Sequence, residues 1–303
     1  MNETTGVLLM AYGTPRNLDD VEAYYTDIRH GRPPSPEALS ELTERYRAIG
    51  GRSPLLDITE AQARALEQNL NGIPVYIGQK HAAPFIRDAV KQMADDGVEH
   101  AVGLVLAPHY SSMSIGDYAR RTAAAADEIG WTGKFEMIES WHLAPGYVDL
   151  LVDRVRAAQA RLSGGAREWS TVVFTAHSLP ESILKTGDPY PEQLAETASV
   201  VAQRGPIDRW RIGWQSAGRT DAAWLGPDIL EVVEDLATHG ERGVVVCPCG
   251  FVADHLEVLY DIDIEAKALA DKLGIELVRT ASPNDDPPFI SVLADVVRRH
   301  TGL

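Results

Sequence analysis

Residues 7–15 read VLLMAYGTP, and residues 172–180 read VVFTAHSLP. Each stretch begins with an apolar run, passes through a ring side chain, Tyr12 or His177, and ends in proline. The apolar runs do not alternate with polar residues, which is typical of strands covered on both faces of a parallel sheet. The two stretches therefore predict two equivalent central strands, each ending at a ring side chain.

Two further pairs of segments repeat in the same order along the chain. YIG at 76–78 with PFI at 84–86 aligns with RIG at 211–213 and PDI at 227–229, and LVLAP at 104–108 aligns with VVVCP at 244–248. Three ordered matches indicate two related halves. Because ligands of such sheets bind beyond the carboxyl ends of the strands, we expect a site in a cleft between the halves, with Tyr12 and His177 facing it.

Strand-like runs alternate with helix-like segments throughout the chain, which predicts an α/β fold with parallel sheets flanked by helices. The expected strands are 7–12, 75–77, 101–106, 134–137, 171–175, 209–214, 243–247 and 276–279. Helices are expected to begin at Ser35 before Pro36 and at Thr59 before Glu60. We expect one half over residues 1–145 and a second over 146–285, with a last helix over 286–303 that returns to the first half.

Composition excludes several classes of protein. The chain has 303 residues, of which 45% are hydrophobic, so it is neither disordered nor collagen-like. Its 28 basic and 44 acidic residues give a net charge of −16, which disfavours nucleic acid and anionic membranes as partners and attracts divalent cations. The first apolar run, 7–11, is too short for a signal peptide or a membrane span, so we expect a cytoplasmic protein.

An acidic run occupies residues 251–265 (FVADHLEVLYDIDIE). On an α-helix, Asp254, Glu257, Asp261 and Glu265 would share one face, and no basic residue lies four positions after any of them. Such a run is usually a solvated surface. Because it follows an expected central strand, it is also a candidate path for a divalent cation.

His177 is the strongest candidate partner for these carboxylates, because it is expected at a strand end. A neutral imidazole with a carboxylate suits Fe²⁺, Co²⁺ or Zn²⁺. Two ligands would hold such an ion loosely, which favours delivery over storage. His81, His109 and His142 also follow strands, but they have no acidic helix beside them in sequence and are weaker candidates.

Several common catalytic motifs are missing from the sequence. It contains no Gly-x-Gly-x-x-Gly after the first strand, no Gly-Lys-Ser/Thr loop and no Gly-x-Ser-x-Gly elbow, which disfavours nicotinamide, nucleotide and serine hydrolase chemistry. Cys247 and Cys249 supply two thiols where an iron–sulfur cluster needs four ligands. We therefore expect them to be packing residues, with redox activity a minor alternative.

Basic and hydroxyl side chains follow the first strand: Arg29, Arg45, Arg52, Tyr46 and Ser53. Their commonest role is surface charge. In so acidic a chain, however, an anionic ligand needs a local patch of this kind.

Six groups of motifs follow one another along the chain: MAYGTP at 10–15, RYRAIGG at 45–51 with SP at 53–54, APH at 107–109, AHSLP at 176–180 with GDPY at 187–190, WQS at 214–216 with WLGP at 224–227, and GFVADHLEVLY at 250–260. In these motifs the sequence resembles ferrochelatases over nearly its whole length, and it is most similar to the soluble Gram-positive type that metallates coproporphyrin III. The resemblance implies a lyase of haem biosynthesis that inserts Fe²⁺ into a porphyrin held between two Rossmann-like, chelatase-type halves, each a four-stranded parallel sheet flanked by helices.

The resemblance also implies roles for individual residues. His177 and Glu257 match the catalytic, metal-side pair, and Asp261 and Glu265 match outer residues that bind a second divalent cation. Tyr12 matches a tyrosine that contacts iron from the opposite face. The positions that match propionate-binding residues are Arg29, Arg45, Tyr46, Ser53 and Tyr118.

Cofactor and partner expectations follow from the same resemblance. No tightly bound cofactor is implied, and Fe²⁺ is a substrate. Some relatives carry a [2Fe–2S] cluster on additional cysteines, but this chain has only Cys247 and Cys249, so we expect no such cluster. Coproporphyrin III is favoured over protoporphyrin IX because the long apolar lip of membrane-associated relatives is not evident. We expect a monomer that makes transient contact with a coprohaem decarboxylase.

Two alternatives remain open at this point. One is a non-catalytic haem or coprohaem carrier, for which an unpaired acidic path would have no use. The other is a cobalt or nickel chelatase of the same superfamily acting on sirohydrochlorin, which the long segment 29–53 and the single expected metal-side histidine disfavour.

Overall fold

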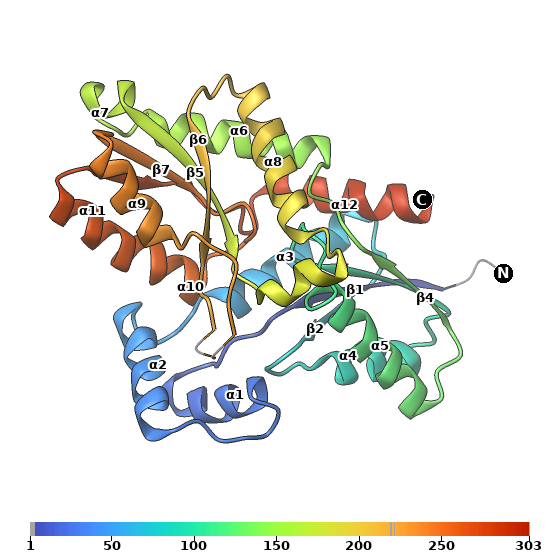
Figure 1. Cartoon of the computed structure of the whole chain (residues 1–303). Helices are drawn as coiled ribbons and strands as arrows, with labels where there is room; N and C mark the ends of the chain where they lie inside the picture. The colour runs from blue at the N-terminus through green and yellow to red at the C-terminus, as the bar shows by residue number, and fades with distance from the viewer. Residues whose placement is uncertain (1–3, 219, 221, 303) are drawn as a thin grey trace. The chain divides into compact units, whose positions relative to one another are not determined.

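The computed structural model describes residues 4–218, 220 and 222–302 (Figure 1). The chain divides into two compact units. The first comprises Met1–Trp141, Ala253–Leu256 and Asn284–Leu303, and the second comprises His142–Val252 and Glu257–Pro283. We expect the first half to contact the porphyrin propionates and the second half to carry the metal-side residues, and this assignment stays a prediction.

The first unit is built on a four-stranded parallel sheet in the order β2-β1-β3-β4. Its strands are β1 (Thr5–Ala11), β2 (Val75–Gln79), β3 (His100–Val105) and β4 (Lys134–Ile138). Its helices are η1 (Leu18–Asp20), α1 (Val21–Ile28), α2 (Pro36–Ala48), α3 (Leu55–Asn69), α4 (Ile86–Asp95), α5 (Ile115–Ile129) and α12 (Pro287–Thr301). The C-terminal α12, red in Figure 1, packs against α3 and β3, with Phe289 and Leu293 fully buried.

The second unit repeats this plan with the strand order β6-β5-β7-β8, again parallel. Its strands are β5 (Ser170–His177), β6 (Trp210–Gln215), β7 (Gly243–Cys247) and β8 (Glu276–Arg279). Its helical segments are α6 (Pro145–Gln159), α7 (Gly164–Glu168), η2 (Glu181–Thr186), α8 (Tyr190–Arg204), α9 (Ile229–Thr238), α10 (Leu256–Leu259), η3 (Asp261–Ala266) and α11 (Lys267–Leu273). The predicted fold class, two four-stranded parallel sheets flanked by helices, is confirmed.

Strand register tests the internal repeat residue by residue. Leu8 pairs with Tyr76 in the first unit, and the equivalent Val173 pairs with Arg211 in the second, as the repeat predicts. Leu9 pairs with Leu104, whereas its equivalent Phe174 pairs with Cys247 rather than with Val244. The third repeat is therefore real but was aligned three residues out of register.

The starts of two predicted helices differ in outcome. Ser35 caps α2 as expected, because its side chain accepts a hydrogen bond from the backbone of Ala38 at 3.3 Å. The predicted start at Thr59 is wrong, since α3 begins at Leu55. The Thr59 hydroxyl instead donates to the carbonyl of Leu55 at 2.8 Å, a bond that competes with capping.

The acidic run does not form one α-helical ridge, which corrects the sequence-based expectation. Asp254 precedes α10 and belongs to the first unit, where its carboxylate accepts from Asn284 at 3.0 Å. Asp261–Ala266 is a π-helix, in which the amide of Glu265 donates to the carbonyl of Tyr260 at 2.9 Å. The 100° rotation per residue assumed for the ridge therefore does not apply beyond Leu259.

Across the described residues, every helix is too short or too polar to cross a lipid bilayer.

Candidate functional site

His177 is the last residue of β5, and its backbone and its ring are both held in place. The buried hydroxyl of Tyr190 donates to the carbonyl of His177 at 3.0 Å. The His177 ring contacts the carbonyl of Ser178 through Nδ1. Because a carbonyl oxygen only accepts, the proton in this contact lies on Nδ1.

Glu257 lies in the first turn of α10, and its backbone is fixed by Gln215 at the end of β6. The fully buried Gln215 amide donates from Nε2 to the carbonyl of Glu257 at 3.0 Å. Its Oε1 accepts from the hydroxyl of Thr175 at 2.7 Å. One side chain thus ties β5, β6 and the start of α10 together.

These supports place His177 Nε2 at 3.6 Å from Glu257 Oε1, with side chains 35% and 27% exposed. Two atoms at this separation could share an ion at an angle of about 120° if both bonds were about 2.1 Å. The two predicted metal-side residues therefore lie together, partly open to solvent. Within the described part of the chain, no three His, Cys, Asp or Glu side chains converge as a metal site.

Asp261 and Glu265 follow on the π-helix, beyond this pair. Asp261 is 4% exposed, and its carboxylate accepts from the Ser216 hydroxyl. Glu265 is partly buried. The intervening Asp263 pairs with Arg279 through bonds of 2.8 and 2.9 Å, so the π-helix also carries a neutralised carboxylate.

Tyr12 follows β1 in the first unit and is 42% exposed. Its ring lies 4.7 Å from the ring of His81, measured between centroids, at an interplanar angle of 58°. His81 is 5% exposed, and its Nδ1 lies 2.7 Å from the carboxylate of Asp27. The sequence-based ranking of His81 as a weak candidate missed this contact, which joins residues 54 positions apart.

The pKa of His81 is lowered to about 4, mainly by burial and also by the charges of Lys80 and Arg121, while the bond to Asp27 opposes the shift. The imidazole is therefore neutral at pH 7. A carboxylate only accepts, so Nδ1 donates to Asp27 and Nε2 carries the lone pair.

Lys80 precedes His81 and also lies near the Tyr12 ring. Its ammonium is 5.9 Å from the ring centroid of Tyr12 and 5.4 Å from that of Tyr118, and it pairs with Asp117 at 2.6 Å. Asp117 also accepts from Arg121 at 3.0 Å. Burial lowers the pKa of Lys80, whereas the Asp117 carboxylate acts in the opposite direction.

The predicted propionate-binding residues fall into two groups. Arg29 is exposed and Arg45 is partly buried. Tyr46, Ser53 and Tyr118 are each at most 4% exposed. The Tyr46 hydroxyl lies 3.3 Å from that of Thr14, and Ser53 accepts from the amide of Leu55 at 3.3 Å.

Both cysteines are buried in the second unit. Burial raises the pKa of Cys247 to about 12 and raises that of Cys249 well above its ordinary value. The buried Tyr147 hydroxyl donates to the carbonyl of Cys249 at 2.6 Å. These thiols have the environment of packing residues rather than of reactive nucleophiles.

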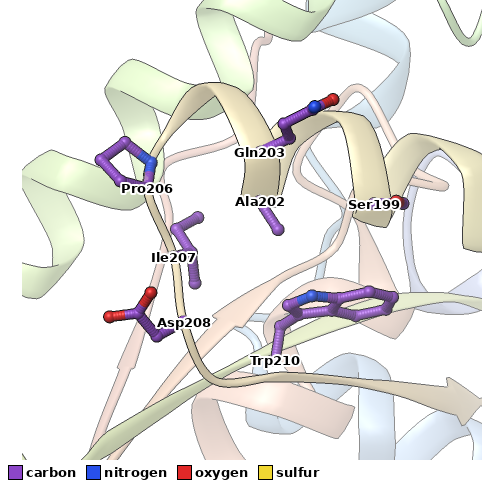
Figure 2. Close-up of a pocket in the computed structure, with 7 residues that line it drawn as sticks. All are labelled: Ser199, Ala202, Gln203, Pro206, Ile207, Asp208 and Trp210. Carbon is purple, nitrogen blue, oxygen red and sulfur yellow. The ribbon is translucent and has the colours of Figure 1, made fainter.

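A shallow pocket of about 500 Å³ lies elsewhere on the second unit (Figure 2). Its lining comes from α8 and from the segment that leads into β6: Ser199, Ala202, Gln203, Pro206, Ile207, Asp208 and Trp210. Because Trp210 begins β6, this pocket lies at the amino end of the strand. It is therefore separate from the strand ends that carry His177 and Gln215.

Several supporting residues have no role that was predicted from the sequence. His142, ranked as a weak candidate, pairs with Glu196 at 3.0 Å, and Tyr190, Gln215 and Ser216 support the metal-side residues. Tyr190 lies in the GDPY motif, and Gln215 and Ser216 lie in the WQS motif. The motifs mark these residues but do not say which atoms their side chains contact.

The chain is similar to proteins of a known family. A family model described as Ferrochelatase matches residues 4–301. The coproporphyrin III ferrochelatase of Halalkalibacterium halodurans is 49% identical over 301 residues, spanning 97% of this chain and 96% of that protein. The protein of the same name from a Geobacillus species is 47% identical over 307 residues, spanning 98% of both.

A solved structure of SirB from Bacillus subtilis with Fe3+ has the same fold. It has a TM-score of 0.63 and 11% sequence identity, and the match covers 98% of this chain and 95% of SirB.

Proposed function

Because this chain belongs to the ferrochelatase family, we propose that it is a lyase that inserts Fe²⁺ into coproporphyrin III to give coprohaem in haem biosynthesis. Relatives that are 47–49% identical over nearly their whole length carry the name of this reaction. Fe²⁺ is a substrate here, and no tightly bound cofactor is implied by the family.

The observation that carries the proposal is the approach of His177 Nε2 to Glu257 Oε1 at 3.6 Å. Metallation must remove two pyrrole protons and bring a partly dehydrated cation over the ring. An imidazole lone pair beside a carboxylate can ligate that cation, accept the protons, or do both. A two-donor set holds the ion weakly enough to release it to the four porphyrin nitrogens.

Porphyrin binding is assigned to the first unit. Arg29 and Arg45 supply charge-assisted hydrogen bonds to propionates, with Tyr46, Ser53 and Tyr118 as the hydroxyl partners. Tyr12, in the same unit, is proposed as a residue that contacts the iron. All three hydroxyl side chains are buried.

Finer features belong to the same proposal. Asp261 and Glu265 bind a second divalent cation, and the chain holds no iron–sulfur cluster, because Cys247 and Cys249 are buried and two thiols cannot complete one. We place the reaction in the cytoplasm, carried out by a monomer that passes coprohaem to a decarboxylase by transient contact.

The experiment is anaerobic incubation with Fe²⁺ and either coproporphyrin III or protoporphyrin IX, followed through the Soret and Q bands. We expect faster conversion of coproporphyrin III. Faster conversion of protoporphyrin IX would overturn the substrate assignment. Binding of coprohaem with no conversion of either porphyrin would identify a carrier, and turnover only of sirohydrochlorin with Co²⁺ or Ni²⁺ would identify the other chelatase class.

His177→Ala tests the catalytic assignment. We expect at least a hundredfold loss of metallation rate, with coproporphyrin affinity changed less than threefold, because the imidazole handles the metal and protons rather than the propionates. The matched control is His239→Ala, which removes an exposed imidazole paired with Asp235 in the same unit. Unchanged turnover in His177→Ala would exclude His177 from the mechanism.

A further inference from the structure

We propose that Asp27 and Asp117 are positioning residues for Tyr12, acting through His81 and Lys80, two side chains that contact the Tyr12 ring. The effect that this positioning has on turnover rests on the proposed function. The arrangement itself lies within the first unit and does not depend on that function.

The need for support follows from the place of Tyr12. It comes directly after β1, is followed by Gly13 with a φ of +97°, and is 42% exposed. An exposed tyrosine in a loop has several accessible rotamers unless its neighbours restrict it. A phenol that must meet a metal at a fixed point therefore needs neighbours that restrict its ring.

His81 supplies the first restriction. The ring centroids of Tyr12 and His81 are 4.7 Å apart, within the range of favourable aromatic pairs. The backbone amide of His81 also donates to the carbonyl of Tyr12 at 3.0 Å, which fixes the two residues side by side. The imidazole itself is fixed by Asp27, whose carboxylate accepts from Nδ1 at 2.7 Å.

Lys80 supplies the second restriction. Its side chain is only 11% exposed, and its ammonium lies 5.9 Å from the Tyr12 ring centroid, within cation–π range. A lysine side chain has many rotamers, so its place depends on the 2.6 Å pair with Asp117. Arg121 steadies this pair by donating to Asp117 at 3.0 Å and to the carbonyl of Lys80 at 3.2 Å.

Two carboxylates that do not stack on Tyr12 thus anchor the two groups that do. Asp27 is on α1 and Asp117 is on α5, so both helices are tied to the loop after β2. This arrangement matches the way outer residues orient the groups that meet a metal or substrate.

The direct test is a ¹⁹F spectrum of protein labelled with 3-fluorotyrosine. The chain has 10 tyrosines, and the Tyr12 signal is identified by its loss in Tyr12→Phe. In both Asp27→Ala and Asp117→Ala, we expect the ¹⁹F chemical shift of Tyr12 to move toward its value in urea-unfolded protein. The change should be a large part of the difference between the folded and the unfolded values. Asp27→Asn should keep it near the wild-type position, because an amide oxygen can still accept from Nδ1.

The matched control is Asp95→Asn, which alters an exposed carboxylate paired with Lys91 at the same 2.6 Å distance in the same unit. It should leave the Tyr12 signal and turnover unchanged. Circular dichroism and melting temperatures confirm that each variant is folded. A Tyr12 signal at its wild-type position in folded Asp27→Ala and Asp117→Ala would overturn the proposal.

Kinetics provide the second readout. We expect Asp27→Ala to lower kcat about tenfold, with the KM for coproporphyrin III changed less than twofold and with Asp27→Asn restoring most of the loss. A rise in KM alone, with kcat unchanged, would contradict positioning at the metal step. If the wild-type protein does not metallate porphyrin, the proposed function fails, while the Tyr12 signal still decides this proposal.

Discussion

Two imidazoles near strand ends are held through the same ring nitrogen. His177 contacts a backbone carbonyl through Nδ1, and His81 contacts the Asp27 carboxylate through Nδ1. Nε2 of the neutral His81 ring keeps its lone pair, and the two side chains differ in exposure. His177 is 35% exposed beside Glu257, which suits a group that meets an ion, whereas His81 is 5% exposed and suits a supporting role.

The buried state of His81 predicts a pH dependence of stability. Its pKa in the fold is lowered to about 4, and an unfolded histidine titrates near 6.5. Between these values the unfolded chain binds more protons, so the free energy of unfolding falls as pH drops from 6.5 to 4. The expected loss is about 3 kcal/mol at most.

Urea unfolding of wild type and His81→Asn across this pH range measures the effect. The unfolding free energy of wild type minus that of His81→Asn should fall by up to about 3 kcal/mol between pH 6.5 and pH 4. Other titrating groups contribute equally to both proteins and cancel in this difference. His239→Asn, which alters an exposed histidine, should follow the wild-type curve. Parallel curves for wild type and His81→Asn would show that this imidazole is not the source.

At the scale of the elements, the apolar pattern predicted which strands exist and their order along the chain better than it predicted the register between repeated strands. The repeat correctly predicted that β1 pairs with β2 in the same register as β5 pairs with β6. The glycine shared by YIG and RIG fixes how these two segments align. The β3 and β7 repeat was three residues out because runs of Val, Leu and Ala align equally well at several offsets. The π-helix at Asp261–Ala266 was missed because periodicity assumes an α-helical pitch.

In the candidate site, too, some residues were predictable from the sequence and others were not. His177 and Glu257 were predicted from strand ends and motifs, and the structure brings them together. The Asp27–His81 and His142–Glu196 pairs each join residues 54 positions apart, on elements whose packing no local pattern reports.

Close packing at Gly250 predicts that the end of β5 tolerates no added methyl group there. A Cβ at Gly250 would lie 2.4 Å from Cβ of Ala176, the residue before His177. The amide of Gly250 also donates to the carbonyl of Thr175 at 3.0 Å, so the turn cannot move away without losing that bond. Gly250→Ala should cost about 1–3 kcal/mol of unfolding free energy and should lower kcat by displacing His177.

Chemical unfolding and metallation assays check this expectation. The matched control is Gly164→Ala, which adds the same atom at the start of α7, where nothing lies within 4 Å. That variant should stay within about 0.5 kcal/mol of wild type and keep full activity. Equal stability of both variants would mean that the segment after β7 adapts without strain.

At the scale of the whole molecule, charge acts in opposite directions on the two substrates. The net charge of −16 attracts Fe²⁺ and repels a porphyrin that carries four propionates. Local groups oppose the second effect, since Asp117 is surrounded by Lys80, Arg120 and Arg121. Contact groups set binding once the porphyrin arrives, whereas the net charge controls its approach.

Salt should therefore shift the two KM values in opposite directions. Raising NaCl from 0.01 to 0.1 M shortens the Debye length from about 30 to about 10 Å, which screens long-range effects and largely spares contacts. We expect the KM for Fe²⁺ to rise about threefold and the KM for coproporphyrin III to fall or stay level. Steady-state kinetics at constant pH, with choline chloride as a second salt, measure both values. A parallel rise in both would mean that the basic contacts outweigh the net charge of the molecule during porphyrin approach.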